Sequence, residues 1–117
     1  MRKYLRSRYL RGKHLEGAVL HRTELRGANL SCRDLRGEYL EGADLGGAVL
    51  QRTDLRGANL IGANLEGADL TGAHLLRADL EDAILSDSIL VCANLKCTNL
   101  EGARLDNADL ESAYMSG

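Results

Sequence analysis

The sequence predicts an all-β repeat protein in which the chain turns once every five residues. Leucine occupies every fifth position from Leu5 to Leu110, twenty-two times in succession, and Met115 occupies the next such position. All fourteen alanines lie two places before this repeating position, and twelve of the thirteen glycines lie two places after it. A fixed short period of this kind is typical of a solenoid, in which one small unit is stacked many times.

The five-residue period excludes the two simple regular structures. Five residues rotate about 140° around an α-helix, so the leucines would scatter over the whole circumference and form no buried stripe. Five is also odd, so an uninterrupted strand would place successive leucines on opposite faces of a sheet. The chain must therefore turn once in each repeat.

Each repeat divides into a short extended segment and a corner. Alanine and leucine, two positions apart, point the same way in the extended segment and form the expected core. Asp or Asn precedes the leucine in eleven repeats, where its short side chain bonds nearby backbone at the corner. Glycine suits the corner because it accepts a positive φ angle without penalty.

The repeats Ala58-Asn59-Leu60, Ala63-Asn64-Leu65 and Ala68-Asp69-Leu70 resemble the motif of the pentapeptide-repeat family. The resemblance covers nearly the whole chain. It implies a right-handed quadrilateral parallel β-helix with four repeats per coil, so that residues twenty apart stack on one another. The 117 residues would then form one solenoid domain of about six coils.

The first residues carry a strong positive charge. Residues 1–14 contain six Lys or Arg residues and no Asp or Glu. We expect residues 1–15 to form an irregular basic capping coil, because the ends of a solenoid need a polar cover. The alternative is a nucleic-acid or anionic-surface binder, whose salt-dependent binding would be lost on replacing Arg6, Arg8 and Arg11.

The two halves of the chain differ in charge. Residues 1–60 contain twelve Lys or Arg and seven Asp or Glu, whereas residues 61–117 contain three and ten. Opposite charge and unpaired strand edges at the two ends favour end-to-end self-association. The alternative is that the chain is a fragment whose natural neighbours cover both ends.

Four repeats per coil would gather charged residues on two adjacent faces. The candidate basic stripe consists of Arg36, Arg56, Arg77 and Lys96. The candidate acidic cluster consists of Asp79, Glu81, Asp82 and Glu101. Asp34 and Asp54 lie beside the first two arginines of the stripe, and we expect them to neutralise part of its field, which favours a solvated face over a site for phosphate or an acidic partner.

The acidic cluster raises one functional alternative. Some pentapeptide-repeat proteins resemble duplex DNA in shape and charge, and bind DNA gyrase or topoisomerase IV at the DNA site. Those proteins usually have many phenylalanines, a strongly acidic surface and a C-terminal dimerising helix. This chain has no Phe and a net charge of only −2, and no helical tail is visible in its sequence. The resemblance to the DNA mimics is therefore incomplete.

Apolar residues at outward positions form the candidate partner patch. Ile84, Ile89 and Val91 occupy outward positions in consecutive repeats. Exposed apolar clusters often mark protein contacts. Arg33 and Glu38, by contrast, replace alanine at inward positions in consecutive repeats, and a mutual salt bridge is the economical explanation.

We predict no catalytic site, no cofactor and no metal. Cys32, Cys92 and Cys97 replace corner glycines, which indicates free thiols, and the three histidines make no metal-ligand spacing with them. No apolar run is long enough for a membrane span, so the expected compartment is the cytoplasm. The sequence thus predicts a non-catalytic scaffold that binds an unidentified protein partner, and nucleic acid is not the expected partner.

Overall fold

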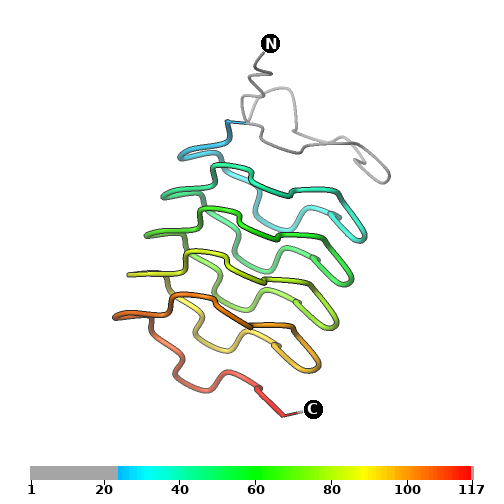
Figure 1. Ribbon diagram of the computed structural model, residues 1–117, viewed down its shortest axis with the longest axis vertical. Coiled ribbons are helices and arrows are strands. Elements are labelled where there is room, and N and C mark those ends of the chain that lie inside the picture. The colour runs from blue at the N-terminus through cyan, green and yellow to red at the C-terminus, as the bar shows by residue number, and fades with distance from the viewer. Residues whose placement is uncertain (1–23, 117) are drawn as a thin grey trace.

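The computed structural model describes residues 24–116, which wind into a stack of flat coils (Figure 1). Each repeat contributes one β-bridge residue, its leucine and a two-residue turn. The bridge residue is the one before each leucine, from Glu24 to Asp109, and the one before Met115. No helix and no strand longer than a single bridge residue occurs in residues 24–116. The predicted basic coil at residues 1–15, with Arg6, Arg8 and Arg11, lies outside the described residues.

The bridges fix the register of the coils at twenty residues. Fifteen parallel bridges each join a residue to the one twenty places later, from Glu24↔Asp44 to Asn94↔Tyr114. Four repeats therefore close one turn of the described part, which confirms the expectation that residues twenty apart stack. The coil has four faces because it has four repeats.

Each face is named here by its first bridge residue. The bridge residues are Glu24, Asp44, Asn64, Ile84 and Arg104 on the Glu24 face; Asn29, Val49, Asp69, Ile89 and Asp109 on the Asn29 face; Asp34, Asp54, His74, Asn94 and Tyr114 on the Asp34 face; and Tyr39, Asn59, Asp79 and Asn99 on the Tyr39 face. Each face also includes, in every coil, the residue before the bridge and the three residues after it.

Backbone hydrogen bonds run along the axis of the stack. The leucine N–H donates to a carbonyl of the next coil, as from Leu65 to Ile84 at 2.7 Å, and the bridge residue donates back, as from Ile84 to Ala63 at 2.9 Å. A third bond closes each corner within the repeat, as from the Ala68 N–H to the Leu65 carbonyl at 3.0 Å. Interior coils thus satisfy their backbone polar groups through their nearest neighbours.

Leucine and alanine fill the core, as the period predicts. Every leucine at the repeating fifth position from Leu25 to Leu95 is at most 2% exposed, whereas Leu100, Leu105 and Leu110 are partly buried. Burial of a leucine side chain contributes about 2 kcal/mol relative to its exposure. The leucine columns are therefore the main source of stability.

Hydroxyl side chains replace the inward alanine at three described positions. Thr53 Oγ1 donates to the Leu30 carbonyl at 2.8 Å, and Thr98 Oγ1 donates to the Leu75 carbonyl at 2.7 Å. Ser88 Oγ donates to the Leu85 carbonyl at 2.6 Å. Each hydroxyl is satisfied locally, so these replacements need no functional explanation.

The expected salt bridge between Arg33 and Glu38 is not found. Glu38 is fully buried and Arg33 is partly buried, and the Nε of Arg33 has no hydrogen-bond partner. The ion pairs within residues 24–116 do not join these two side chains. Consecutive repeats lie on adjacent faces, so equivalent positions five residues apart do not stack. The prediction of this pair was wrong for that reason.

The corners use the predicted chemistry. All eleven Asp or Asn residues that precede a leucine accept a bond from the N–H two residues later, as Asn64 does from Glu66 at 3.0 Å. The second turn residue has a positive φ, which nine glycines adopt and nine other residues must also adopt. The left-handed region is unfavourable for residues with a Cβ atom.

We expect the triple replacement of Cys32, Cys92 and Cys97 by glycine to stabilise the protein. Their φ angles are 61°, 60° and 58°, and relief of the left-handed strain is worth about 1 kcal/mol per site. Urea unfolding should show this gain. Ser31→Gly is the control, because Ser31 is the first residue of the same turn as Cys32 and has no positive φ. An unchanged or lowered stability of the triple variant would contradict the account of the corner.

Candidate functional site: the arginine and aspartate ladder

Charge is divided unevenly among the four faces of the described residues. The Tyr39 face carries six carboxylates, of which only Glu38 is buried in the core, and no lysine or arginine. The adjacent Asp34 face carries five cations and two carboxylates. Its cations are Arg33, Arg36, Arg56, Arg77 and Lys96, and its carboxylates are Asp34 and Asp54. One side of the rod is therefore basic, although residues 24–116 hold eight Lys or Arg against sixteen Asp or Glu.

The acidic cluster lies together on the Tyr39 face. Asn99 Nδ2 donates to Asp79 Oδ1 at 3.1 Å and to Glu81 Oε2 at 3.4 Å. Asp82 and Glu101 occupy the corner of the same face, and the Asp82 N–H donates to the Glu101 carbonyl at 2.9 Å. Asn99 thus bridges two of the four carboxylates, and the cluster is an ordered surface of the fold.

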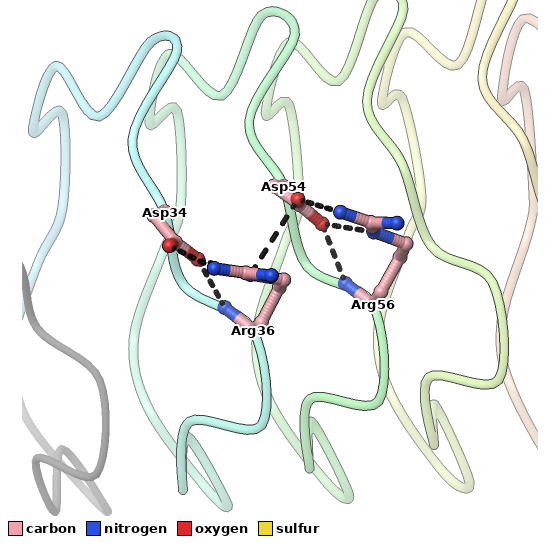
Figure 2. Close-up of polar contacts among 4 residues, drawn as sticks. All are labelled: Asp34, Arg36, Asp54 and Arg56. Carbon is pink, nitrogen blue, oxygen red and sulfur yellow. Dashed lines mark hydrogen bonds and ion pairs between the residues drawn. The ribbon is translucent and has the colours of Figure 1, made fainter.

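The basic stripe is built on a ladder of ion pairs (Figure 2). Arg36 is paired with Asp34 through two bonds, from Nε to Oδ1 at 2.8 Å and from Nη2 to Oδ2 at 2.7 Å. Arg56 is paired with Asp54 in the same way, at 2.8 and 2.6 Å. The Arg36 Nε also lies 3.8 Å from Asp54 Oδ2 in the next coil. Carboxylates and guanidinium groups therefore alternate along the axis.

The repeat itself explains this geometry. The bridge residue and the first turn residue are two positions apart, so both side chains project from the same side of the corner. The carboxylate also accepts the backbone N–H of its arginine, at 3.2 Å for Arg36 and 3.3 Å for Arg56. This third bond fixes the carboxylate, which in turn fixes the plane of the guanidinium. The two arginines are therefore held in place before any ligand binds.

The ladder shifts the ionisation of its members. The side-chain bond from Arg56, followed by its backbone bond and charge, lowers the pKa of Asp54, although burial acts in the opposite direction. The same bond and the charge of Asp54 raise the pKa of Arg56. On the Asn29 face, burial raises the pKa of Asp69, but the bonds from Thr71 and Gln51 together outweigh it and lower this pKa. The three side chains are ionised at neutral pH.

We expect the ionised Asp54 side chain to stabilise the fold at neutral pH, and we expect this stabilisation to be lost in acid. Its pKa in the folded protein lies below its ordinary value of 3.8, so the fold favours the ionised form. This contribution is complete above 3.8 and disappears as the pH falls through the folded pKa. A carboxyl titration by nuclear magnetic resonance should give a midpoint below 3.8 in the wild type and a higher one in Arg56→Gln. A wild-type midpoint at or above 3.8 would contradict the ladder.

The ladder stops at the coil after Arg56. His74 takes the position of the aspartates there, and Leu76 takes the position of the arginines. An open groove of about 340 Å³ lies at this point, lined by Arg36, Arg56, Gly57, Leu76 and Arg77. Sequence reasoning placed the arginines on one face but did not find this groove. The signal was present in two neighbouring columns, in the change from Asp54 to His74 and in the change from Arg56 to Leu76.

The candidate partner patch spans a corner between two faces. Ile84 lies on the Glu24 face, and Ile89 and Val91 lie on the Asn29 face. Ile89 is 39% exposed, whereas Ile84 and Val91 are partly buried. The three side chains are neighbours along the chain, but they project in two directions. The patch is consequently small.

The described residues contain no group of three or more His, Cys, Asp or Glu side chains arranged to hold a metal ion. The three cysteines are free and exposed. Residues 24–116 contain no helix that is long and apolar enough to cross a membrane.

Comparison with known proteins gives one family over residues 4–117. A scan of protein families matches the chain to pentapeptide repeats, in eight copies, over residues 4–37, 34–72, 48–87, 63–96 and 93–117. No curated protein matches the chain in sequence.

Solved structures of three other pentapeptide repeat proteins are among those that resemble the chain. Rfr23, a pentapeptide repeat protein from the cyanobacterium Cyanothece 51142, is 34% identical over 79% of this chain and 63% of its own, with a TM-score of 0.77. HetL, a pentapeptide repeat protein involved in heterocyst differentiation regulation from the cyanobacterium Nostoc, is 37% identical over 83% of this chain and 51% of its own, with a TM-score of 0.60. A pentapeptide repeat protein from the thylakoid lumen of Arabidopsis thaliana is 34% identical over 79% of this chain and 62% of its own, with a TM-score of 0.61. The chain spans less than two thirds of each.

Parallel four-sided coils with a leucine and a small inward residue on each side define a square β-solenoid. The chain belongs to the pentapeptide repeat family, whose known structures are right-handed quadrilateral β-helices.

Proposed function

We propose that the chain is a non-catalytic scaffold that holds a protein partner against the side of a rod of about six coils in the cytoplasm. The observation that carries the proposal is the patch of Ile84, Ile89 and Val91. The preceding coil has Asn64, Asp69 and Thr71 at the same three positions. The repeat does not require apolar side chains at these places, so their presence favours a contact with another protein.

The interior supports a role without catalysis. Leucine and alanine fill the core of the described residues, and the groove beside Arg56 is open to solvent on the outside of the stack. Enzyme sites usually lie in concave pockets that bury most of the substrate. A flat side that presents fixed columns of side chains suits the recognition of a protein surface.

The preceding coil supplies the variant that tests the patch. Ile84→Asn/Ile89→Asp/Val91→Thr copies Asn64, Asp69 and Thr71, including the pair in which Thr71 Oγ1 donates to Asp69 Oδ1 at 2.6 Å. We expect this variant to fold with a stability within about 1 kcal/mol of the wild type, as surface changes usually do. The control variant Val49→Asp/Ile61→Asp changes outward apolar residues outside the patch.

The experiment compares the three proteins as bait in the lysate of the organism that encodes the chain. We expect one partner to be retained by the wild type and the control, and to be lost with the patch variant. A partner retained equally by all three proteins would overturn the patch. Recovery of a topoisomerase would favour the DNA-mimic alternative instead.

That alternative has one feature in its favour, the Tyr39 face, which has five carboxylates outside the core and no cation. The basic Asp34 face interrupts the continuous negative surface that a DNA mimic needs. We therefore expect no inhibition of gyrase in a supercoiling assay at micromolar protein. Inhibition that is lost on Glu81→Gln/Glu101→Gln would replace the scaffold proposal with the DNA mimic.

A further inference from the structure

The ladder on the Asp34 face lacks one carboxylate. Arg36 lies between two of them, bonded to Asp34 at 2.7 Å and 3.8 Å from Asp54. Arg56 is paired with Asp54, and no second carboxylate of residues 24–116 lies within 4.0 Å of it. The repeat would place that second carboxylate at position 74, where the chain has His74. One side of the Arg56 guanidinium therefore faces the groove instead of an aspartate.

The groove has the space and the donors to receive a carboxylate from outside. A Cβ atom added to Gly57 would meet nothing within 4 Å, so the lining is open there. Arg77 borders the groove, and its side chain makes no hydrogen bond or ion pair with the described residues. Arg56 donates to Asp54 through Nε and Nη2, and the remaining N–H groups of the Arg56 guanidinium are left for a ligand.

Charge and shape favour a carboxylate that belongs to a protein. Asp34 and Asp54 offset two of the cations, so the local excess of charge suits a monoanion better than a phosphate dianion. The carboxylate would take the same place beside Arg56 that Asp54 takes beside Arg36. Leu76 offers an apolar contact at the edge of the groove. An acidic residue flanked by an apolar one matches both features.

We infer that the groove of Arg56, Leu76 and Arg77 binds a glutamate or aspartate side chain of an acidic partner segment. The inference rests on the proposed scaffold function and names the chemistry of the partner. The carboxylate accepts N–H bonds from Arg56 and from Arg77, and its apolar neighbour packs on Leu76. Because Arg56 is held in position by Asp54, binding orders few further side chains.

The test is a nuclear magnetic resonance titration with a defined probe. The probe is a capped hexapeptide in which two glutamates alternate with two leucines between terminal glycines, and its control has glutamine in place of glutamate. We expect the glutamate peptide to shift the backbone amides of Gly57 and Arg77, and we expect its binding to weaken as salt is raised. The glutamine peptide should leave both signals unchanged.

Two glycine variants separate the site from general charge. Arg77→Gly removes a ligand-binding side chain at a corner with φ of 61°, and Arg52→Gly removes an equal charge at a corner with φ of 55°. Glycine suits both corners, so both variants should stay folded. We expect Arg77→Gly to weaken peptide binding about tenfold, as the loss of one charge-assisted hydrogen bond implies. Arg52→Gly should have much less effect.

Three results would overturn the inference: equal weakening by the two variants, equal binding of the glutamine peptide, or no shift of Gly57 and Arg77. Tighter binding of inorganic phosphate than of the peptide would assign the groove to phosphate groups instead. The patch variant Ile84→Asn/Ile89→Asp/Val91→Thr should bind the peptide like the wild type. The proposal for the apolar patch and the inference for the groove are thus tested independently of each other.

Discussion

Leu65→Ala is expected to lower the free energy of unfolding by about 3 to 5 kcal/mol. Leu65 is fully buried between Leu45 and Leu85, which occupy the same column in the coils on either side. Removal of three buried carbon atoms loses their transfer free energy and leaves a cavity that a rigid stack of coils closes only in part. Urea unfolding followed by far-ultraviolet circular dichroism measures the loss.

Leu105→Ala is the matched control, because Leu105 belongs to the same column but is only partly buried. We expect it to cost less than half as much as Leu65→Ala. Equal losses at the two positions would contradict the assignment of the leucine column as the core of the stack.

The second large effect concerns the length of the repeat. Deletion of Gly67 alone shortens one corner to a single turn residue, and it removes the bonds from the Gly67 N–H to the Ser86 carbonyl and from the Ala68 N–H to the Leu65 carbonyl. The corner then cannot keep both flanking leucines inside. We expect a loss of at least about 3 kcal/mol, the sum of a buried leucine and two hydrogen bonds at the low end of their ranges.

Deletion of the whole repeat at residues 63–67 is expected to leave the protein folded. Deletion of one complete repeat keeps every inward residue pointing inward. The free energy of unfolding should therefore fall by only about 1 kcal/mol or less, which is what five residues contribute on average. Unfolding of both deletion variants would contradict a five-residue unit, and so would a similar small loss in both.

The five-residue deletion also moves every later residue to the preceding face. Asp79 and Glu81 then stack on Asp54 and Arg56, while Arg77 moves to the column of Arg52. The carboxylate missing from the ladder would be supplied by the chain itself. We therefore expect this variant to lose binding of the glutamate peptide, while Ile84, Ile89 and Val91 keep their mutual arrangement and still retain the proposed partner.

Much of the fold was predictable because the relevant forces act within a single repeat. The inward leucine and alanine, the polar residue before the leucine and the corner at Gly67 follow from side-chain period and φ preference alone. The twenty-residue register was different, since spacing requires a turn every five residues but does not set the number of turns that close a coil. The family resemblance supplied that number, and the bridge between Asp44 and Asn64 shows it.

The site was predictable only in part. The pairing of Asp34 with Arg36 follows from their spacing on one side of a corner. The groove beside Arg56 depends on which residues stack one coil later, so it emerges only when His74 and Leu76 are read in columns. The error at Arg33 and Glu38 has the same origin, because neighbours in sequence were treated as neighbours in the stack.

The central claim is the register of twenty residues, because this register determines which residues share a face. A disulfide cross-link tests it most directly. In the background Cys32→Gly/Cys92→Gly/Cys97→Gly, the pair Asp44→Cys/Asn64→Cys joins adjacent coils where Asn64 Nδ2 now donates to Asp44 Oδ1 at 3.3 Å. Adjacent strands lie about 4.8 Å apart, which suits a disulfide.

The control pair Asp44→Cys/Asn59→Cys lies on adjacent faces. After mild oxidation, intact mass should show a nearly complete intramolecular disulfide for the first pair and free thiols for the second. Free thiols in the first pair, or equal oxidation of both, would contradict the register.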